Sequence, residues 1–224
     1  MSSASPEGAP RASQSGAPTS PHPAKDALRA AVHAARAADP GREAADAARL
    51  PRLLEVSRGH ATVACYLSVP PEPDTTALVE ALADAGVRVL LPVLKGHRTP
   101  AWGWYDGPGS LVPGWRGIPE PGGEALGPDA LAACSLVWVS ALRATPAGYR
   151  LGTGGGWYDR ALLRARPDAV RATLVGEGEL VDTLPRDPWD LPVDLVVTPA
   201  DTIATGARGV PWPPEAEQPR QHAR

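Results

Sequence analysis

The chain of 224 residues contains no phenylalanine, one methionine and two cysteines. Cys65 and Cys134 lie far apart in apolar stretches, and neither belongs to a Cys-x-x-Cys pair, so neither a disulfide framework nor a zinc site is indicated. We expect both to be buried thiols, as in proteins of the reducing cytoplasm. No apolar run has the length of a membrane-spanning helix. Residues 1–16 contain no apolar signal region, so we expect a cytoplasmic protein that does not bind membranes.

Strong charge of either sign is also missing. Twenty-two Lys and Arg residues stand against 25 Asp and Glu residues, which gives a net charge of −3. Nucleic-acid binding favours a clearly basic domain or face, so we expect no nucleic-acid partner. A local site for a small anion remains open, and the sequence offers no feature that argues for assembly beyond a monomer.

Residues 1–23 are rich in Ser, Pro, Ala and Gly, and this composition predicts a disordered tail. Residues 205–224 have a similar composition and are interpreted in the same way. The intervening residues 24–204 have the length of one globular domain.

Helices and strands are expected to alternate within this domain. We predict helices over 24–39, 42–59, 75–86 and 157–167, the second of them kinked or broken at Pro51. Apolar, β-branched runs predict strands over 61–69, 87–94, 135–139, 171–178 and 193–202. This order predicts an α/β fold: a single domain with a mostly parallel open sheet flanked by helices. In such sheets, ligands bind at the loops beyond the carboxyl ends of the strands.

The stretch "GYRLGTGGGWYDRAL" at 148–162 follows the strand predicted at 135–139 and has five glycines within nine residues. Such density does not suit a helix or a strand, but glycine-rich backbone can curl its N–H groups around an anion. Arg150 could bind a phosphate in bidentate fashion, and Asp159 suits a magnesium ion that shares phosphate oxygens. The P-loop ending Gly-Lys-Ser/Thr is missing, and Trp157 stands where the dinucleotide fingerprint has its last glycine. The stretch therefore has the parts of a nucleoside triphosphate site of another kind.

The same stretch resembles the signature of the 5-formyltetrahydrofolate cyclo-ligase family. Five further segments are similar to motifs of that family and occur in its order, so the resemblance spans about residues 24–204. They are "KDALR" at 25–29, "YLSVPPEPDTTALV" at 66–79, "RVLLPVL" at 88–94, "RGIPEP" at 116–121 and "WDLPVDLVVTP" at 189–199.

The resemblance implies an enzyme that uses ATP as a co-substrate and Mg²⁺ as a cofactor. Its reaction, part of one-carbon metabolism, converts 5-formyltetrahydrofolate to 5,10-methenyltetrahydrofolate and releases ADP and phosphate. Phosphorylation of the formyl oxygen makes a leaving group, and the N10 nitrogen of the folate then displaces it. Chemistry of this kind needs positioned cations and backbone amides more than covalent help from the protein.

The resemblance also implies roles for individual residues. Arg150 and Trp157 are expected to be catalytic, with Trp157 beside the reacting formyl group. Leu67 and Glu72 are expected to bind the folate, and Asp159 and Asp190 the magnesium ion. The residues expected to bind ATP lie on the first helix and in the glycine-rich stretch: Lys25, Arg29, Arg150, Leu151, Gly152, Thr153, Gly154, Gly155, Gly156, Trp157 and Tyr158.

Several of these residues have ordinary alternatives. Lys25 and Arg29 could form a solvated helix face, Glu72 could be an exposed loop acid, and Asp190 could cap a turn. Trp102, Trp104 and Trp115 could fill the core in place of phenylalanine. The chain also departs from the family where Ala144 and Thr145 replace a Phe-Asp pair. A non-catalytic nucleotide- or folate-binding homologue, or an ATP-dependent ligase with another small substrate, therefore stays as an alternative.

Overall fold

The computed structural model describes residues 22–210 and 212. Seven strands form one sheet in the order β11-β10-β9-β6-β1-β2-β3. Neighbouring strands from β10 to β2 are parallel, whereas β3 and β11 are antiparallel strands at the two edges. The bounds are β1 Thr62–Ala64, β2 Arg88–Pro92, β3 Trp102–Trp104, β6 Leu136–Val139, β9 Val170–Leu174, β10 Leu195–Val197 and β11 Thr202–Ala204.

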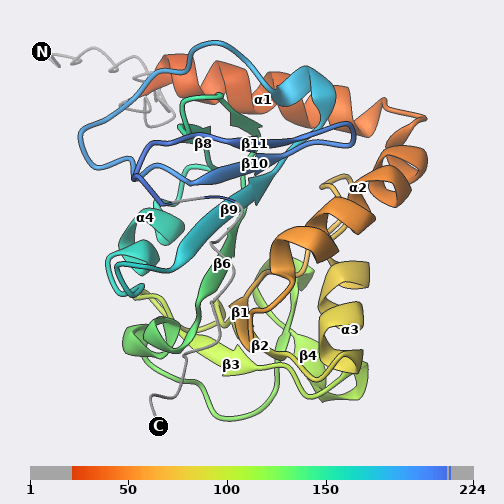
Figure 1. The fold of residues 1–224 in the computed structure, drawn as a ribbon, viewed down its shortest axis with the longest axis vertical. Helices are drawn as coiled ribbons and strands as arrows, with labels where there is room; N and C mark the ends of the chain where they lie inside the picture. The colour runs from red at the N-terminus through yellow and green to blue at the C-terminus, as the bar shows by residue number, and fades with distance from the viewer. Residues whose placement is uncertain (1–21, 211, 213–224) are drawn as a thin grey trace, which may run out of the picture.

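Four α-helices surround this sheet (Figure 1). The helix α1 lies across one end of the sheet, α2 and α3 lie together on one side, and α4 lies on the other. Two small hairpins, β4–β5 and β7–β8, complete the strands. The bounds are α1 Pro23–Ala37, α2 Arg42–Ser57, α3 Thr76–Asp84, α4 Trp157–Leu162, β4 Leu111–Pro113, β5 Pro119–Pro121, β7 Arg143–Ala144 and β8 Arg150–Leu151, with short 3₁₀ turns η1 Pro108–Ser110, η2 Trp115–Gly117, η3 Pro128–Ala133 and η4 Glu177–Glu179.

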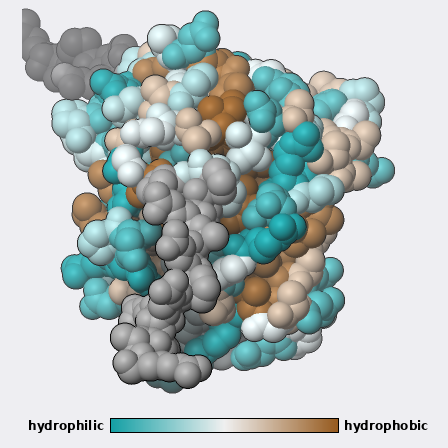
Figure 2. All heavy atoms as spheres, viewed as in Figure 1, coloured by the Kyte–Doolittle hydropathy of each residue, from teal (hydrophilic) through white to brown (hydrophobic). Residues whose placement is uncertain are grey.

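The central strands are buried on both faces, as expected for parallel strands covered by helices. In β6, Leu136 and Trp138 join the core under α2 and α3, while Val137 and Val139 join the core under α4 and η3. On the face shown in Figure 2, hydrophilic residues spread over the helices and loops, and hydrophobic residues appear in patches between them. No helix in the described part of the chain is long and apolar enough to cross a membrane.

The predicted α/β class and the mostly parallel sheet are confirmed, with differences in detail. The helix α2 runs through Pro51 without a break, because Leu53, Val56 and Ser57 at its far end are anchored by burial. The strand predicted at 61–69 ends at Ala64, and the chain continues as a loop. The helix predicted at 157–167 ends at Leu162, before the strongly exposed Leu163.

The antiparallel strands β3, β4, β5, β7, β8 and β11 were not predicted. These strands have only two or three residues, too few for an alternating pattern to stand out. The packed chain also extends past residue 204, where we expected a tail to begin. Arg208 forms an ion pair with Asp194 at 2.6 Å, and Val210 and Trp212 pack against the core. The rest of both expected tails lies outside the described residues.

Candidate active site

A hairpin sets the glycine-rich loop in place. From the sequence we expected the loop to follow the parallel strand β6 directly. The strands β7 and β8 instead stand between β6 and residues 152–156. Gly148 turns this hairpin with φ +85°, and a Cβ there would lie 2.5 Å from the carbonyl oxygen of Val193. Thr145 is buried and accepts a hydrogen bond from the Tyr149 amide at 3.2 Å. Its hydroxyl therefore supports the turn of the hairpin.

The loop itself is open and tied down from two helices. Gly154 and Gly156 have positive φ values of +105° and +58°, which favour glycine. Arg29 of α1 donates to the Gly152 carbonyl at 2.9 Å, and Arg160 of α4 donates to the Gly155 carbonyl at 3.0 Å. Within the described chain, the amides of residues 153–155 donate no hydrogen bond, and these residues are exposed. They are available to an anionic ligand.

Lys25 lies at the start of α1 and is 7% exposed. Its Nζ donates to Asp187 Oδ2 and to Asp190 Oδ2, each at 2.7 Å. Burial works against the ammonium, but the hydrogen bonds to the two aspartates outweigh it and raise the pKa of Lys25. Asp190 also accepts the Asp187 amide at 2.8 Å, which holds the turn between them. The solvated helix face considered for Lys25 is therefore wrong, because the residue is buried and paired.

Arg150 lies in β8, and its guanidinium is turned inward. Its Nη2 donates to Asp159 Oδ1 at 3.0 Å, and its side chain is 3% exposed. The Leu191 amide donates to the same Asp159 oxygen at 3.2 Å. Arg150 thus orients the carboxylate at the exit of the loop, and Leu191 brings the Asp190 turn next to it.

Asp159 and Asp190 have the chemistry to bind a magnesium ion together with phosphate oxygens. The hydrogen bonds described above use Oδ1 of Asp159 and Oδ2 of Asp190, and the other oxygen of each carboxylate accepts no hydrogen bond within residues 22–210 and 212. The same residues contain no group of three or more His, Cys, Asp or Glu poised for a metal. Magnesium usually binds through one or two carboxylates plus substrate phosphates, so two carboxylates fit this ion.

Trp157 and Tyr158 begin α4 as part of an aromatic cluster. The Trp157 ring contacts the rings of Trp102 and Tyr158 edge-on, with centroids 4.9 Å apart in both pairs. Its Nε1 is buried and has no hydrogen-bond partner among residues 22–210 and 212. Tyr158 in turn contacts Tyr66, with centroids 6.4 Å apart. The cluster anchors the exit of the loop, and a role of Trp157 beside the formyl group stays a prediction.

Leu67 and Glu72 lie in the loop that follows β1. Leu67 is buried, and Glu72 is half-buried and accepts the Val69 amide at 3.2 Å. The parallel strands β1 and β6 are neighbours, so their following loops emerge at the same edge of the sheet. The chain places β2 on one side of β1 and β6 on the other, so the direction of strand order reverses between β1 and β6. Ligands of open α/β sheets bind at such a point, beyond the carboxyl ends of the strands. The fold therefore gathers the folate and ATP residues that we expected at one place.

Sequence reasoning missed one contributor to this site, Asp187. Asp187 stands three residues before Asp190, and only the fold reveals that both carboxylates meet Lys25. Trp102 is fully buried against Trp157, which agrees with core filling, whereas Trp104 is half-buried and Trp115 is 47% exposed.

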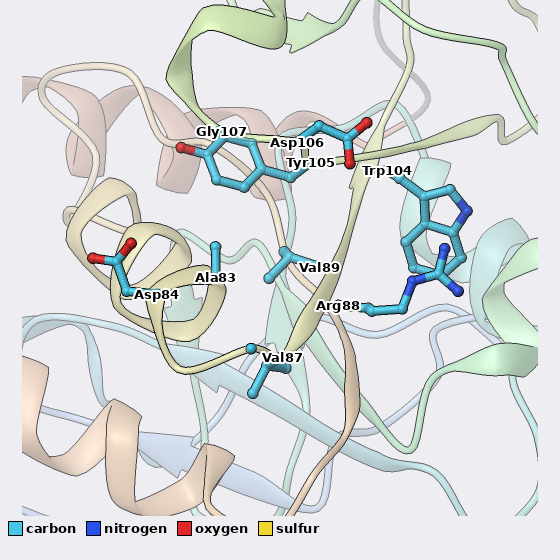
Figure 3. A pocket seen from close by; sticks show the side chains of 10 residues that line it. Ala83, Asp84, Val87, Arg88, Val89, Trp104, Tyr105, Asp106 and Gly107 are labelled. Atoms are coloured by element: carbon cyan, nitrogen blue, oxygen red, sulfur yellow. The ribbon is translucent and has the colours of Figure 1, made fainter.

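A hollow of about 310 Å³ lies elsewhere, between the end of α3 and strands β2 and β3 (Figure 3). In it, Arg88 stacks on Trp104, with the guanidinium carbon 3.8 Å from the ring centroid. Arg88 is the first residue of β2, so this hollow is at the amino edge of the parallel strands. It is separate from the glycine loop.

Comparisons with known proteins identify relatives of this chain. The model of the 5-formyltetrahydrofolate cyclo-ligase family matches residues 21–199. The 5-formyltetrahydrofolate cyclo-ligase of Mycolicibacterium smegmatis is 38% identical over 143 residues, which cover 62% of this chain and 73% of the relative. The enzyme of that name from Escherichia coli K12 is 35% identical over 144 residues, 62% of this chain and 78% of the relative.

Solved structures show the same fold. The NMR structure of Aquifex aeolicus 5,10-methenyltetrahydrofolate synthetase aligns with a TM-score of 0.68 at 25% identity and covers 89% of this chain and 99% of that one. A 5,10-methenyltetrahydrofolate synthetase from Mycoplasma pneumoniae aligns with a TM-score of 0.62 at 19% identity, over 79% of this chain and 99% of that one. With the family model matching most of the chain, we conclude that it belongs to the 5-formyltetrahydrofolate cyclo-ligase family.

Proposed function

We propose that this protein catalyses the ATP- and magnesium-dependent conversion of 5-formyltetrahydrofolate to 5,10-methenyltetrahydrofolate. The observation that carries the proposal is the open glycine loop at the carboxyl edge of the sheet. Within the described chain its amides are free, Arg29 donates to its Gly152 carbonyl, and it leads into α4, where Asp159 accepts the amide of Leu191 next to Asp190. Family membership supplies the substrates.

In the first step, the formyl oxygen attacks the γ-phosphorus of ATP, an O–P bond forms and ADP leaves. In the second, N10 attacks the formyl carbon, and the C–O bond breaks so that phosphate departs with the oxygen. The attack of N10 closes the five-membered ring, so departure of phosphate and loss of the N10 proton leave the methenyl product. Phosphoryl transfer of this kind depends on charge neutralisation and alignment.

For the phosphates of ATP, we assign the loop amides of residues 152–156 together with Lys25 and Arg29. Their support is the free amides and the bond from Arg29 to Gly152, which holds the guanidinium beside the loop. Asp159 and Asp190 are the residues that would hold Mg²⁺, which supplies charge neutralisation on the phosphate oxygens when bound. Arg150 orients Asp159 from behind the loop.

For the folate, we assign Leu67 and Glu72, because they lie in the loop after β1, at the same edge of the sheet as the glycine loop. Trp157 stays assigned beside the formyl group, and its contact with Trp102 would fix its position. The fully buried Tyr158 hydroxyl supports this neighbourhood without ionising, since burial raises its pKa well above the ordinary value.

We also propose that the enzyme works as a monomer in the cytoplasm, with ATP and a reduced folate as its partners. Both cysteines are buried free thiols, which suits a reducing compartment. Light scattering coupled to size-exclusion chromatography tests the monomer, which we expect at the mass of one chain, 23.3 kDa. A mass of two chains contradicts it.

The competing functions are binding without catalysis and ligation of another small substrate. Two observations favour these alternatives. The Arg150 guanidinium is turned inward, and the Trp157 Nε1 is buried. The test follows absorbance in the methenyl band with 5-formyltetrahydrofolate, ATP and Mg²⁺, leaving out one component at a time. We expect a rise that needs all three. No rise, with ATP binding intact by calorimetry, supports a binding homologue, and turnover of ATP only with another amide supports a different ligase.

A further inference from the structure

The hollow at the amino edge of the sheet has no part in the proposed reaction (Figure 3). Its volume of about 310 Å³ is in the range of small-molecule sites. Ala83, Val87 and Val89 supply apolar surface between the end of α3 and the start of β2. Charged and polar side chains line the hollow as well: Asp84, Arg88, Tyr105 and Asp106.

Arg88 brings a guanidinium to the hollow that is held in place but not neutralised. Its guanidinium carbon lies 3.8 Å from the centroid of the Trp104 ring. Within residues 22–210 and 212, its side chain makes no hydrogen bond and no ion pair. Stacking fixes the plane of the guanidinium and leaves its N–H groups free along the edge. This arrangement suits bidentate binding of a carboxylate.

Asp84 brings a carboxylate in a place that its own helix disfavours. It is the last residue of α3, where the helix dipole opposes a negative charge, and the last turn contains no basic residue to compensate. Among the described residues, no side chain forms an ion pair with it. A cation bound in the hollow would offset this unfavourable charge.

Tyr105 adds a hydroxyl that has no hydrogen-bond partner in the described part of the chain, although the residue is only 8% exposed. Figure 3 shows its ring over Ala83, with the hydroxyl on the side of α3 that carries Asp84. Burial raises the pKa of Tyr105, and the negative charges of Glu80 and Asp84 raise it further. The hydroxyl therefore keeps its proton at neutral pH, and it can accept a hydrogen bond from a ligand ammonium group.

The charges are distributed unevenly around the hollow. Figure 3 shows Asp84 on one side and Arg88 on the other, with Asp106 between Tyr105 and the stacked pair of Arg88 and Trp104. An acid and a base thus lie near one end, apolar surface lies in the middle, and a second acid lies at the far end. With two carboxylates against one guanidinium, a ligand with one net positive charge would neutralise the lining.

We propose that this hollow is a binding site for a basic α-amino acid such as lysine, separate from the active site. The α-carboxylate binds the edge of the Arg88 guanidinium, and the α-ammonium binds Asp106. The side-chain ammonium binds Asp84 and the Tyr105 hydroxyl, and the methylene groups between the two ends cover the apolar surface of Val87. Each charge of the ligand thereby meets an opposite charge that the fold leaves without a partner among the described residues.

The test compares lysine with three relatives that each lack one of its charged groups. Norleucine lacks the side-chain ammonium, ε-aminocaproate lacks the α-ammonium, and cadaverine lacks the carboxylate. Each compound is titrated into the ¹⁵N-labelled full chain at constant ionic strength, and the indole signal of Trp104 is followed by NMR. We expect lysine to bind in the millimolar range, because the hollow is open and few groups contact the ligand. Each relative should bind roughly ten-fold more weakly or less, as for loss of one charge-assisted hydrogen bond.

Two variants assign the ends of the ligand. Asp84→Asn should weaken lysine binding roughly ten-fold and leave norleucine binding unchanged, and Asp129→Asn, which alters another exposed acid, is its control. Arg88→Gln should weaken lysine binding by a similar factor and leave cadaverine binding unchanged. Arg116→Gln is the matched control for Arg88→Gln, because Arg116 also stacks on a tryptophan, at 4.4 Å, but does not line the hollow.

Binding is measured without turnover, so the result does not depend on the proposed function. An unmoved Trp104 signal with lysine, or a signal that sodium chloride moves equally, overturns the inference. Equal affinity for lysine and norleucine overturns it too, since Asp84 would then bind no ligand ammonium. Equal affinity for lysine and cadaverine does the same for the role of Arg88, and so does lysine binding that both variants leave intact.

Discussion

At the scale of single residues, charges that looked like solvated groups form a compact network. Lys25 joins two aspartates, and Arg150 joins Asp159. The sequence indicated the residue types for a phosphate and metal site, because glycine, arginine and aspartate in this spacing suit that chemistry. It could not indicate which charges pair with one another, since the partners of Lys25 are 162 and 165 residues away.

Arg150 gives the sharpest test at this scale. Arg150→Ala leaves the half-buried Asp159 without its guanidinium, so we expect kcat/KM to fall by about 10²-fold or more and the magnesium requirement to rise. Arg164→Ala is the matched control, because Arg164 is exposed and pairs only with the exposed Asp129. Steady-state rates across a magnesium titration measure both effects. A variant with wild-type rates would remove Arg150 from the catalytic machinery.

The two thiols give a second residue-scale test. Burial raises the pKa of Cys65 and of Cys134 to about 12, so neither forms a thiolate at neutral pH. We expect a thiol reagent such as DTNB to label the native protein negligibly and to label both cysteines after unfolding in guanidinium chloride. Rapid labelling of the native protein would contradict their burial.

At the scale of elements, the central strands and the long helices followed from apolar runs and helix signals. The β7–β8 hairpin that carries Arg150 did not, because two-residue strands leave no periodic pattern. Its geometry depends on a long-range contact, because Gly148 lies against the backbone of Val193, which precedes β10. The hairpin that positions Arg150 and the glycine loop was therefore predicted by its residues but not as secondary structure.

Gly148→Ala tests that contact. A Cβ there would sit 2.5 Å from the Val193 oxygen, and φ is +85°, so we expect a loss of about 1–3 kcal/mol in the free energy of unfolding and a lower activity. Gly109→Ala serves as the control, since a Cβ at Gly109 meets no atom within 4 Å. Urea unfolding of both variants gives the measurement. Equal stability of the two would mean that the hairpin does not need glycine at 148.

His60, in the turn between α2 and β1, should make the stability of the protein depend on pH. His60 bonds Ser135 through Nδ1 at 2.8 Å, its Nε2 is buried without a partner, and burial lowers its pKa below 6.5. The unfolded chain binds the proton of His60 more readily than the folded chain does. The contribution of neutral His60 to the free energy of unfolding is therefore fully present above pH 6.5 and is lost as the pH falls below it. We expect His60→Gln to flatten the fall in unfolding free energy between about pH 6.5 and 5. The exposed His33→Gln should retain the wild-type slope; a wild-type slope in His60→Gln would contradict the assignment.

At the scale of the whole molecule, one edge of the sheet collects the loops after β1, β6, β9 and β10, together with α1 (Figure 1). The glycine loop lies at that edge, as does a cavity of about 470 Å³ between α1, α2 and these loops, while the hollow of Figure 3 lies at the other edge. The alternation of helices and strands was enough to predict such an edge. The cavity between α1, α2 and these loops could not be predicted, because its walls come from five segments that are separate in the sequence: 32–49, 71–73, 143, 176–179 and 199.

The central claim is that ATP phosphorylates the formyl oxygen at this edge, and following that oxygen tests it most directly. The protein is incubated with ATP, Mg²⁺ and 5-formyltetrahydrofolate labelled with ¹⁸O in the formyl group, and the released phosphate is analysed by mass spectrometry. We predict one ¹⁸O in each phosphate for each methenyl product formed. Methenyl product accompanied by unlabelled phosphate would contradict the account, because the formyl oxygen would then have left by another route.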